Sequence, residues 1–359
     1  MRIDAERAAP SMPPGKVEGP SAWLGPEVAS RDDWKFSITP DDQREVEHAV
    51  EAFERSGRPL IEIRGEDFQL PSLGPRLKKV LHELLQGRGF VMLHGLDISH
   101  YSKQQVAIAY LGLGTYFGSF RSQNAKGHLL GHVKDQGLDI ADPRVRFYQT
   151  SRKLGYHTDS SDLVALLCLK TARMGGESFI ASSVTCYNEL LRRVPHLLPK
   201  LFDPMATDRR GEVPPGEQPW FDVAVFNWYQ GKLITIYGGE YIKAAQQNFP
   251  QAARLTTAHW EALEAFEAIL DDPAVHLSMP FHPGDIQILN NHQVLHARND
   301  FVNWPEPERH RHKLRLWISP PYGQALPPSF APRYGNLRPG DRGGIVVDGM
   351  KLTVPLDPE

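Results

Sequence analysis

From about residue 128 onward, short apolar segments bounded by turn residues follow one another without regular helices between them. Parallel neighbours need crossover connections of about a dozen residues or more, usually helical, so this spacing favours antiparallel pairing. The pattern therefore predicts a mainly β fold of the α+β class, an antiparallel sandwich or barrel with helices packed outside it. The expected strands in this region are 144–151, 163–172, 178–183, 232–237, 285–290 and 312–319.

Helices are expected mainly before this region. Thr39 can cap a helix that starts at Pro40, and apolar residues then recur at three- and four-residue spacing until Gly57 ends the run. Similar stripes predict further helices, and two short apolar runs predict strands. The further helices are 73–86, a helix from Ser102, 182–194 and 256–270, and the strands are 60–65 and 89–96.

The chain divides into three parts by composition. Residues 1–20 are rich in proline and glycine and are expected to form a flexible N-terminal arm. Residues 21–320 are expected to form one domain with helical insertions. Residues 321–359 form a C-terminal extension, in which Asp348-Gly349 between two apolar stretches predicts a β-hairpin.

The charge balance argues against several classes of protein. The chain has 40 Lys+Arg against 43 Asp+Glu, so it lacks the excess of basic residues typical of nucleic-acid or membrane-surface binding. Its longest apolar run, 163–169, is far shorter than the roughly 20 residues of a membrane span. We expect no secretory signal, and the two cysteines, Cys168 and Cys186, suit reduced thiols in a cytoplasmic protein. Nothing in the pattern specifies an oligomeric state.

The segment GYHTDSSD contains a possible metal-binding pair. In an extended segment, His157 and Asp159 point to the same face and can occupy adjacent positions of a metal ion. The simpler interpretation is a loop in which Thr158, Asp159 and Ser160 make local turn hydrogen bonds.

A second cluster, PGDIQILNNHQVLHARNDF, lies far downstream and includes His296 just beyond a predicted strand. Two strands could bring His157, Asp159 and His296 to one metal as a 2-His-1-carboxylate triad, which leaves coordination positions open. His292 and His296 are also four residues apart, as on a zincin helix. However, no Glu follows His292, and the preceding turn residues disfavour a helix there.

The segment 309–320 predicts a strand with a cationic face. Arg311, Lys313, Arg315 and Trp317 share one face, and alternate apolar residues share the other. Such a face is either an exposed edge or an inward row that binds anions, because unpaired buried cations are unfavourable. An inward arginine beside a metal would suit a dicarboxylate, which guanidinium binds through two parallel hydrogen bonds.

Taken together and in order, these segments resemble the taurine dioxygenase / clavaminate synthase-like family of Fe(II)- and 2-oxoglutarate-dependent oxygenases. The resemblance spans residues 58–320, most of the chain. It implies a double-stranded β-helix, or jelly roll, with flanking helices. The segments that carry it are HTD at 157–159, MGGES at 174–178, PGD at 283–285, NNHQVLHAR at 290–298 and RHKLRLW at 311–317.

The resemblance also implies roles for individual residues. His157, Asp159 and His296 match the iron ligands, and Arg311 matches the arginine that pairs with the distal carboxylate of 2-oxoglutarate. Ser178 stands where the family commonly has Thr, and its hydroxyl can donate to the same carboxylate. Arg315 matches an arginine that binds the anionic end of the substrate in some relatives.

The implied cofactors are Fe(II), the cosubstrate 2-oxoglutarate and O2, with release of succinate and CO2. Halogenating relatives replace the carboxylate ligand by Gly or Ala, so Asp159 favours hydroxylation. The expected partner is a small-molecule substrate, anionic or amino-acid-like. The alternatives are a zinc hydrolase, which gives no reason for an inward Arg311 or for Ser178, and a jelly roll without activity, against which the intact ligand triad argues. If Asp159 were not a ligand, Asp162 would be the nearest other carboxylate.

Overall fold

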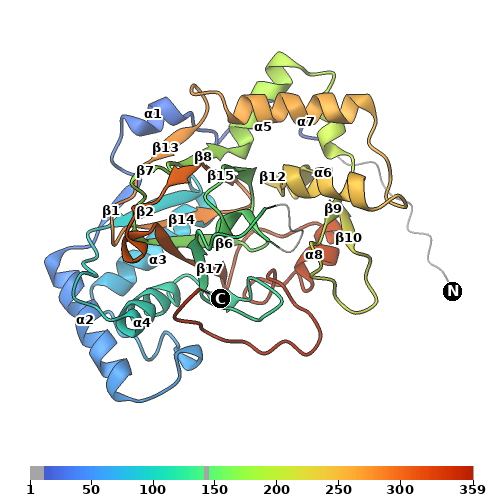
Figure 1. The fold of residues 1–359 in the computed structure, drawn as a ribbon. Helices are drawn as coiled ribbons and strands as arrows, with labels where there is room; N and C mark the ends of the chain where they lie inside the picture. Colours follow the sequence, from blue (N-terminus) through green and yellow to red (C-terminus); the bar gives the residue numbers. More distant parts are fainter. Residues whose placement is uncertain (1–11, 141–144, 359) are drawn as a thin grey trace.

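Two β-sheets lie face to face at the centre of the molecule in the computed structural model, which describes residues 12–140 and 145–358 (Figure 1). Phe90, Val164 and Trp317 of the larger sheet pack with Ile180 and Val294 of the smaller one in a buried apolar cluster. The pairing is antiparallel apart from one edge, as the strand spacing predicts. The two facing sheets match the expected jelly-roll sandwich.

The larger sheet has seven strands in the order β1-β2-β14-β6-β17-β3, and β4 also pairs with β17. Strand β17 lies between β6 on one side and β3 and β4 on the other, and its register with β6 sets Lys313, Arg315 and Trp317 on the inner face. Leu314, Leu316 and Ile318 point outward to the helices. The strand bounds are β1 Lys35–Ser37, β2 Phe90–His94, β3 Ser119–Arg121, β4 Gly131–Lys134, β6 Leu163–Lys170, β14 Ile286–Asn290 and β17 His312–Ser319.

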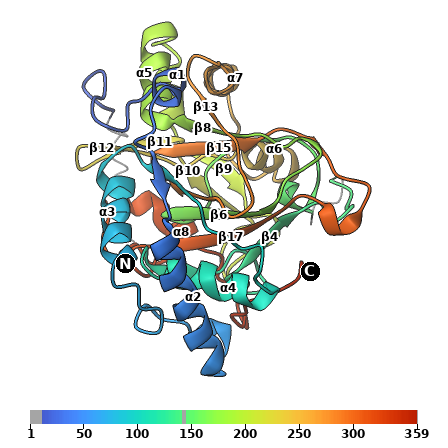
Figure 2. The same cartoon turned by 90° about the vertical axis from the view of Figure 1, so that its left-hand side faces the viewer.

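Helices cover the outer face of each sheet (Figure 2). The larger sheet is covered by α2 Pro40–Arg55, α3 Leu73–Gln86 and α4 Lys103–Gly114. Thr39 caps α2 in a reciprocal capping box with Asp42, as the sequence suggested for this start. The smaller sheet, β13-β8-β15-β5, is covered by α5 Ser183–Arg193 and α7 Thr257–Leu270. Its bounds are β5 Leu154–His157, β8 Ser178–Ser182, β13 Leu277–Met279 and β15 Val294–Arg298.

The remaining elements are short and lie around the sandwich. The helices are α1 Gly25–Ala29, α6 Gly239–Asn248 and α8 Ala331–Tyr334. The strands form three two-stranded pairs: β7 Met174–Gly175 with β16 Phe301–Val302, β9 Met205–Asp208 with β10 Trp220–Val223, and β11 Phe226–Tyr229 with β12 Lys232–Thr235.

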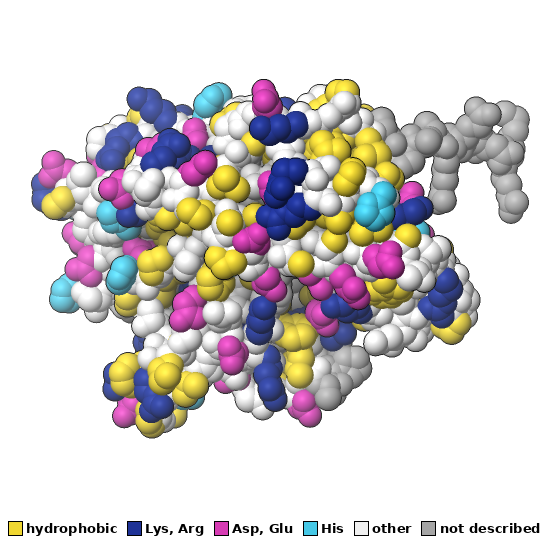
Figure 3. Space-filling view, turned by 90° about the horizontal axis from the view of Figure 1, so that it is seen from above, with side chains coloured by type: hydrophobic (Ala, Val, Ile, Leu, Met, Phe, Trp, Pro, Cys, Tyr) yellow, Lys and Arg dark blue, Asp and Glu magenta, His cyan; other side chains and the backbone are white. Residues whose placement is uncertain are grey.

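No helix in the described ranges is both long and apolar enough to cross a lipid bilayer. Figure 3 shows basic and acidic side chains interspersed on one face of the molecule.

Three local predictions were wrong. Residues 60–65 hold a 3-10 turn, Leu60–Glu62: only Ile63 of this segment is buried, and the segment pairs with no strand of the described structure. In 144–151, of which Arg144 lies outside the described residues, a 3-10 turn at Phe147–Gln149 directs Tyr148 toward a cavity. Asp348-Gly349 makes a turn, but no hairpin follows, because Thr353 pairs instead with His128.

Of the expected N-terminal arm, residues 1–20, the structure describes residues 12–20. Residues 12–20, expected to be loose, are docked on α5. The Val17 backbone bonds to the Asn188 side chain in both directions, and the Tyr187 hydroxyl donates to Gly15 O. The domain boundaries near residues 20 and 320 stay a prediction.

The C-terminal extension is fastened to the sandwich by a buried ionic network. Arg342, which is 1% exposed, donates from Nε to both oxygens of Asp162 at 2.8 and 2.9 Å. The same carboxylate accepts from Ser319 Oγ at 3.0 Å and lies 2.8 Å from His292 Nε2. These contacts hold the pKa of Asp162 below its usual value, although its burial acts in the opposite direction. Asp162 is thus an ionised group whose charge is matched by Arg342.

We predict that Arg342→Met destabilises the protein by about 3–5 kcal/mol, because it leaves the Asp162 carboxylate buried without a counter-charge. Arg338→Met is the matched control, since Arg338 pairs with Asp341 on the surface and such pairs contribute at most about 1 kcal/mol. Urea unfolding of both variants measures the difference. Similar losses in the two variants would show that the network does not stabilise the fold.

Candidate active site

The two histidines of the predicted metal triad lie on neighbouring strands. His157 ends β5, His296 lies in the middle of β15, and the register of these strands places the two residues directly opposite each other. Their rings are 4.2 Å apart between centroids. Asp159 follows on the loop from β5 to β6. Residues 139 positions apart in the chain therefore meet because β5 and β15 pair.

One ligand atom from each of His157, Asp159 and His296 can be chosen so that all three lie within 4.8 Å of one another. His157 Nε2 is 3.9 Å from Asp159 Oδ1, and His296 Nε2 is 3.8 Å from Asp159 Oδ2. Both separations are too long for hydrogen bonds. They suit donor atoms that surround a divalent metal at about 2.0–2.2 Å from each. The donor set therefore fits a transition-metal ion.

The protonation states favour the same interpretation. Burial, reinforced by the neighbouring His157, lowers the pKa of His296 to about 3. Burial also lowers the pKa of His157, whose Nδ1 lies 2.9 Å from Gly155 O, so that Nδ1–H donates and Nε2 keeps its lone pair. Burial raises the pKa of Asp159, but the cationic Arg315 guanidinium outweighs this effect and the pKa is lowered overall. Neutral imidazoles and an ionised carboxylate are the forms that bind metals.

Asn291 holds the loop that carries Asp159. Its Oδ1 accepts from the Asp159 backbone N–H at 3.0 Å, and its Nδ2 donates to Ser161 O at 3.0 Å. Asn291 is fully buried in the turn between β14 and β15. The sequence motif NNH contained this residue, but its spacing alone did not reveal a role, because its partners lie 130 and 132 residues away.

Two residues considered as alternative ligands have other partners. Asp162 is bound to Arg342 and His292 in the network described above, so it is not available to a metal. His292 is part of that network, and β15 is a strand, which excludes the zincin helix.

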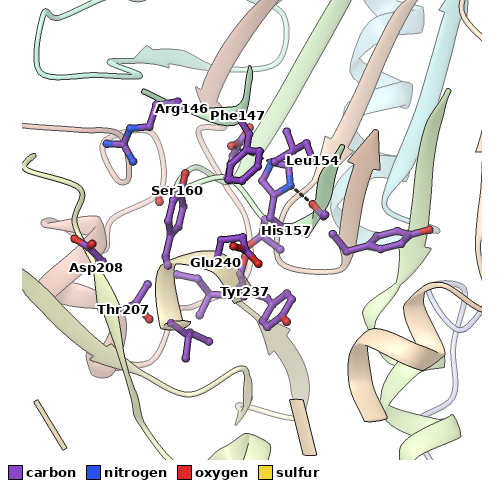
Figure 4. A pocket seen from close by; sticks show the side chains of 18 of the residues that line it. Arg146, Phe147, Leu154, His157, Ser160, Thr207, Asp208, Tyr237 and Glu240 are labelled. Atoms are coloured by element: carbon purple, nitrogen blue, oxygen red, sulfur yellow. Dashed lines mark hydrogen bonds and ion pairs between the residues drawn. The ribbon is translucent and has the colours of Figure 1, made fainter. Parts of the chain in front are cut away.

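Two cavities meet at the triad. The larger, of about 470 Å³, is lined by His157, Asp159 and residues of β9, β10 and α6. The smaller, of about 40 Å³, lies toward the sandwich interior and is lined by His157, His296 and several cations. Figure 4 shows residues that line the larger cavity. Arg146 and Asp208, which also line it, lie away from the His157 ring.

The predicted cosubstrate residues all line the smaller cavity. Arg311 and Arg315 are 3% and 8% exposed, so the cationic face of β17 is inward. Arg315 Nη1 lies 3.5 Å from both Asp159 oxygens, and its Nε donates to Gln123 Oε1 at 2.7 Å. Arg311 Nη1 is buried without a hydrogen-bond partner in the described structure. Ser178 Oγ accepts from Lys313 Nζ at 3.1 Å. The structure thus assembles Arg311, Ser178 and Arg315 beside the triad.

Similar proteins were found among curated sequences and solved structures. FR-33289 synthase of Streptomyces rubellomurinus is 29% identical over 88% of this chain and 94% of its own length. Taurine hydroxylase-like protein SAT17 of Stachybotrys chartarum is 30% identical over 84% of this chain and 79% of its own.

Among solved structures, an asparagine oxygenase complex with Fe(II), hydroxyasparagine and succinate superposes with a TM-score of 0.58 at 15% identity. It covers 79% of this chain and 93% of that chain. The non-heme iron oxygenase OrfP with Fe and alpha-ketoglutaric acid gives 0.60 at 12% identity, with coverage of 79% and 93%. At such identities these matches confirm the fold, the predicted jelly roll.

A family model matches residues 45–317, about three quarters of the chain, and this stretch includes the triad, Ser178, Arg311 and Arg315. The match confirms the family expected from the sequence motifs. The chain belongs to the taurine catabolism dioxygenase TauD, TfdA family.

Proposed function

We propose that this protein is an Fe(II)- and 2-oxoglutarate-dependent dioxygenase that hydroxylates a small anionic or amino-acid-like molecule. One observation carries the proposal. Two neutral imidazoles and an ionised carboxylate face a common point, with a cation-lined cavity on one side and a larger cavity on the other. This arrangement provides separate spaces for a dicarboxylate cosubstrate and a second substrate.

His157, Asp159 and His296 would hold the iron and leave coordination positions open. Bound iron supplies the activation of dioxygen, coupled to decarboxylation of 2-oxoglutarate to succinate and CO2, with one oxygen atom inserted into a substrate C–H bond. Arg311 and Ser178 would hold the distal carboxylate in the smaller cavity. Arg315, fixed by Gln123, orients Asp159 through its guanidinium and presents positive charge where the cavities meet.

The charged residues that line the larger cavity favour a substrate that itself carries charge. Arg333 on α8 lines it and donates from Nε to Ser160 Oγ at 2.6 Å, while no carboxylate of the described residues forms an ion pair with it. Its remaining N–H groups are available for an anionic group. Acidic residues line the same cavity, among them Glu240 and Asp208, so a substrate with both an ammonium and an acidic group would find partners.

The relatives agree with this class of substrate. The asparagine oxygenase structure contains hydroxyasparagine, and an OrfP structure contains (3S)-hydroxy-L-Arg. Both are amino acids. A zinc hydrolase would also use three ligands, but it would have no use for a buried Arg311 without a carboxylate partner.

Cys168 and Cys186 are both free and buried, which supports a reducing, cytoplasmic location.

The proposal is tested first with the wild-type chain. Anaerobic addition of 2-oxoglutarate to the Fe(II)-loaded protein should produce a weak visible charge-transfer band. A panel of amino acids and small acids should then be screened aerobically for a compound that stimulates succinate release. A colourless mixture, together with hydrolytic activity that depends on zinc, would overturn the proposal.

We predict that wild-type protein binds one Fe(II) per chain and that His296→Ala abolishes this stoichiometric binding, because two remaining donors hold the ion too weakly. His282→Ala is the control, since the His282 side chain is 81% exposed and lies outside both cavities. Equilibrium dialysis with metal analysis gives the stoichiometry. Full iron binding by both His157→Ala and His296→Ala would remove these residues as ligands.

Asn291→Ala is expected to weaken Fe(II) binding by about 10–100-fold, because the Asp159 backbone loses the acceptor that orients it. Competition with a coloured chelator measures the affinity. In Asn299→Ala, the lost contact is with Glu177 on the surface, so iron affinity should stay as in the wild type. An unchanged affinity in Asn291→Ala would mean that the loop positions Asp159 without this contact.

Arg311→Met should weaken 2-oxoglutarate binding by about 2–5 kcal/mol, because it removes one partner of a desolvated charge pair. Arg309 is half-exposed and pairs with Glu306, so Arg309→Met should have little effect. Anaerobic titration of the charge-transfer band gives both dissociation constants. Equal effects would show that the strand register, or the arginine, has been assigned wrongly.

A further inference from the structure

Lys313 is a buried lysine beside the proposed cosubstrate site. It lies between Arg311 and Arg315 on the inward face of β17, is 3% exposed and lines the smaller cavity. Its Nζ donates to Ser178 Oγ at 3.1 Å and lies 3.1 Å from the centroid of the Phe281 ring. The aromatic ring and one hydroxyl are weak partners for an ammonium group that has left water.

The surroundings of Lys313 contain further cations, and within the described residues no carboxylate lies within ion-pair distance of its ammonium group. Arg298 and Arg311 line the same cavity, and Nη1 of each is buried without a hydrogen-bond partner. Arg298 otherwise donates to the backbone oxygens of Thr150 and Arg152. Within the described residues, no carboxylate forms an ion pair with any of these three side chains. Burial and mutual repulsion lower the pKa of Lys313 well below its usual value.

Uncompensated buried charges destabilise a fold, so a cluster of three needs an explanation. The cavity of about 40 Å³ that they line has room for a group of a few atoms. His157 and His296 line it as well, so a chelating ligand of the metal would begin beside these two residues. A carboxylate that enters this cavity would meet Arg311 Nη1 and Lys313 Nζ together, and its charge would offset part of the repulsion between them.

We propose that Lys313 is a second cationic anchor for the distal carboxylate of 2-oxoglutarate, shared with Arg311, and that Ser178 orients its ammonium group. The inference rests on the proposed function. It assigns Lys313 a role in binding the cosubstrate that neither Arg311 nor Ser178 fulfils alone. It also explains why a lysine can remain in this interior without a carboxylate of the chain beside it.

The proposal predicts opposite effects on stability and on binding. In ligand-free protein, Lys313→Met replaces a buried amino group that has no anionic partner by an apolar group of similar length, so its melting temperature should equal or exceed that of the wild type. The same variant should bind 2-oxoglutarate at least tenfold more weakly. A purely structural lysine would show the reverse, a lower melting temperature and unchanged binding.

The experiment uses the full chain loaded with Fe(II) under anaerobic conditions. The charge-transfer band is titrated with 2-oxoglutarate and with 2-oxopentanoate, which has the same carbon chain but no distal carboxylate. We expect Lys313→Met to reduce the preference for 2-oxoglutarate at least tenfold and to leave 2-oxopentanoate binding unchanged. Lys170→Met, at an exposed lysine on β6, is the control and should preserve the preference.

Each outcome decides a separate question. If wild-type protein binds neither keto acid, the proposed function fails. If wild-type protein prefers 2-oxoglutarate and Lys313→Met keeps that preference within twofold, only the role of Lys313 is overturned. Should the methionine variant not fold, Lys313→Gln repeats the titration with an uncharged hydrogen-bonding side chain. Loss of folding in both variants would assign the ammonium a structural role and overturn the proposal.

Discussion

The pairing of Asp162 with Arg342 is the interaction on which the arrangement of the site depends. Asp162 lies at the end of the β5–β6 loop that carries Asp159, directly before β6. By binding Arg342, Ser319 and His292 at once, its carboxylate joins this loop to the C-terminal extension, to the end of β17 and to the β14–β15 turn. The loop that carries Asp159 is therefore fixed at the end remote from β5, while the pairing of β5 with β15 places His157 opposite His296.

The inward face of β17 represents the opposite use of buried charge. Asp162 and Arg342 neutralise each other, whereas Arg311 and Lys313 have no carboxylate partner in the described structure. The first arrangement stabilises the fold. The second leaves cationic side chains without a carboxylate partner beside the proposed metal ligands. A protein that retains such charges gives up some stability for affinity toward an anionic ligand. The alternation of β17 allows both, because its outward residues pack on the helices and contribute the apolar core.

Much of the fold could be predicted because apolar periodicity reports local structure. The alternation in 312–319 correctly separated the cationic face from the core face, and the capping pattern at Thr39 correctly placed α2. Errors arose where a short apolar segment did not reveal its backbone partner. Residues 60–65 pair with no strand of the described structure, and Thr353 in the tail pairs with His128 and not across a hairpin. The triad residues were recognisable as a motif, whereas their meeting depends on the register of β5 with β15. Asn291 was overlooked, and Lys313 was given no separate role, because their partners are distant in sequence.

The position of Arg342 in the chain has a consequence for biosynthesis. Its partner Asp162 precedes it by 180 residues, so the ribosome has made both sheets before the counter-charge of this carboxylate exists. Until residue 342 leaves the exit tunnel, the β5–β6 loop that carries Asp159 lacks its contact with the C-terminal extension. The residues proposed to bind a metal are therefore held by all of these contacts only after the chain has been made as far as residue 342.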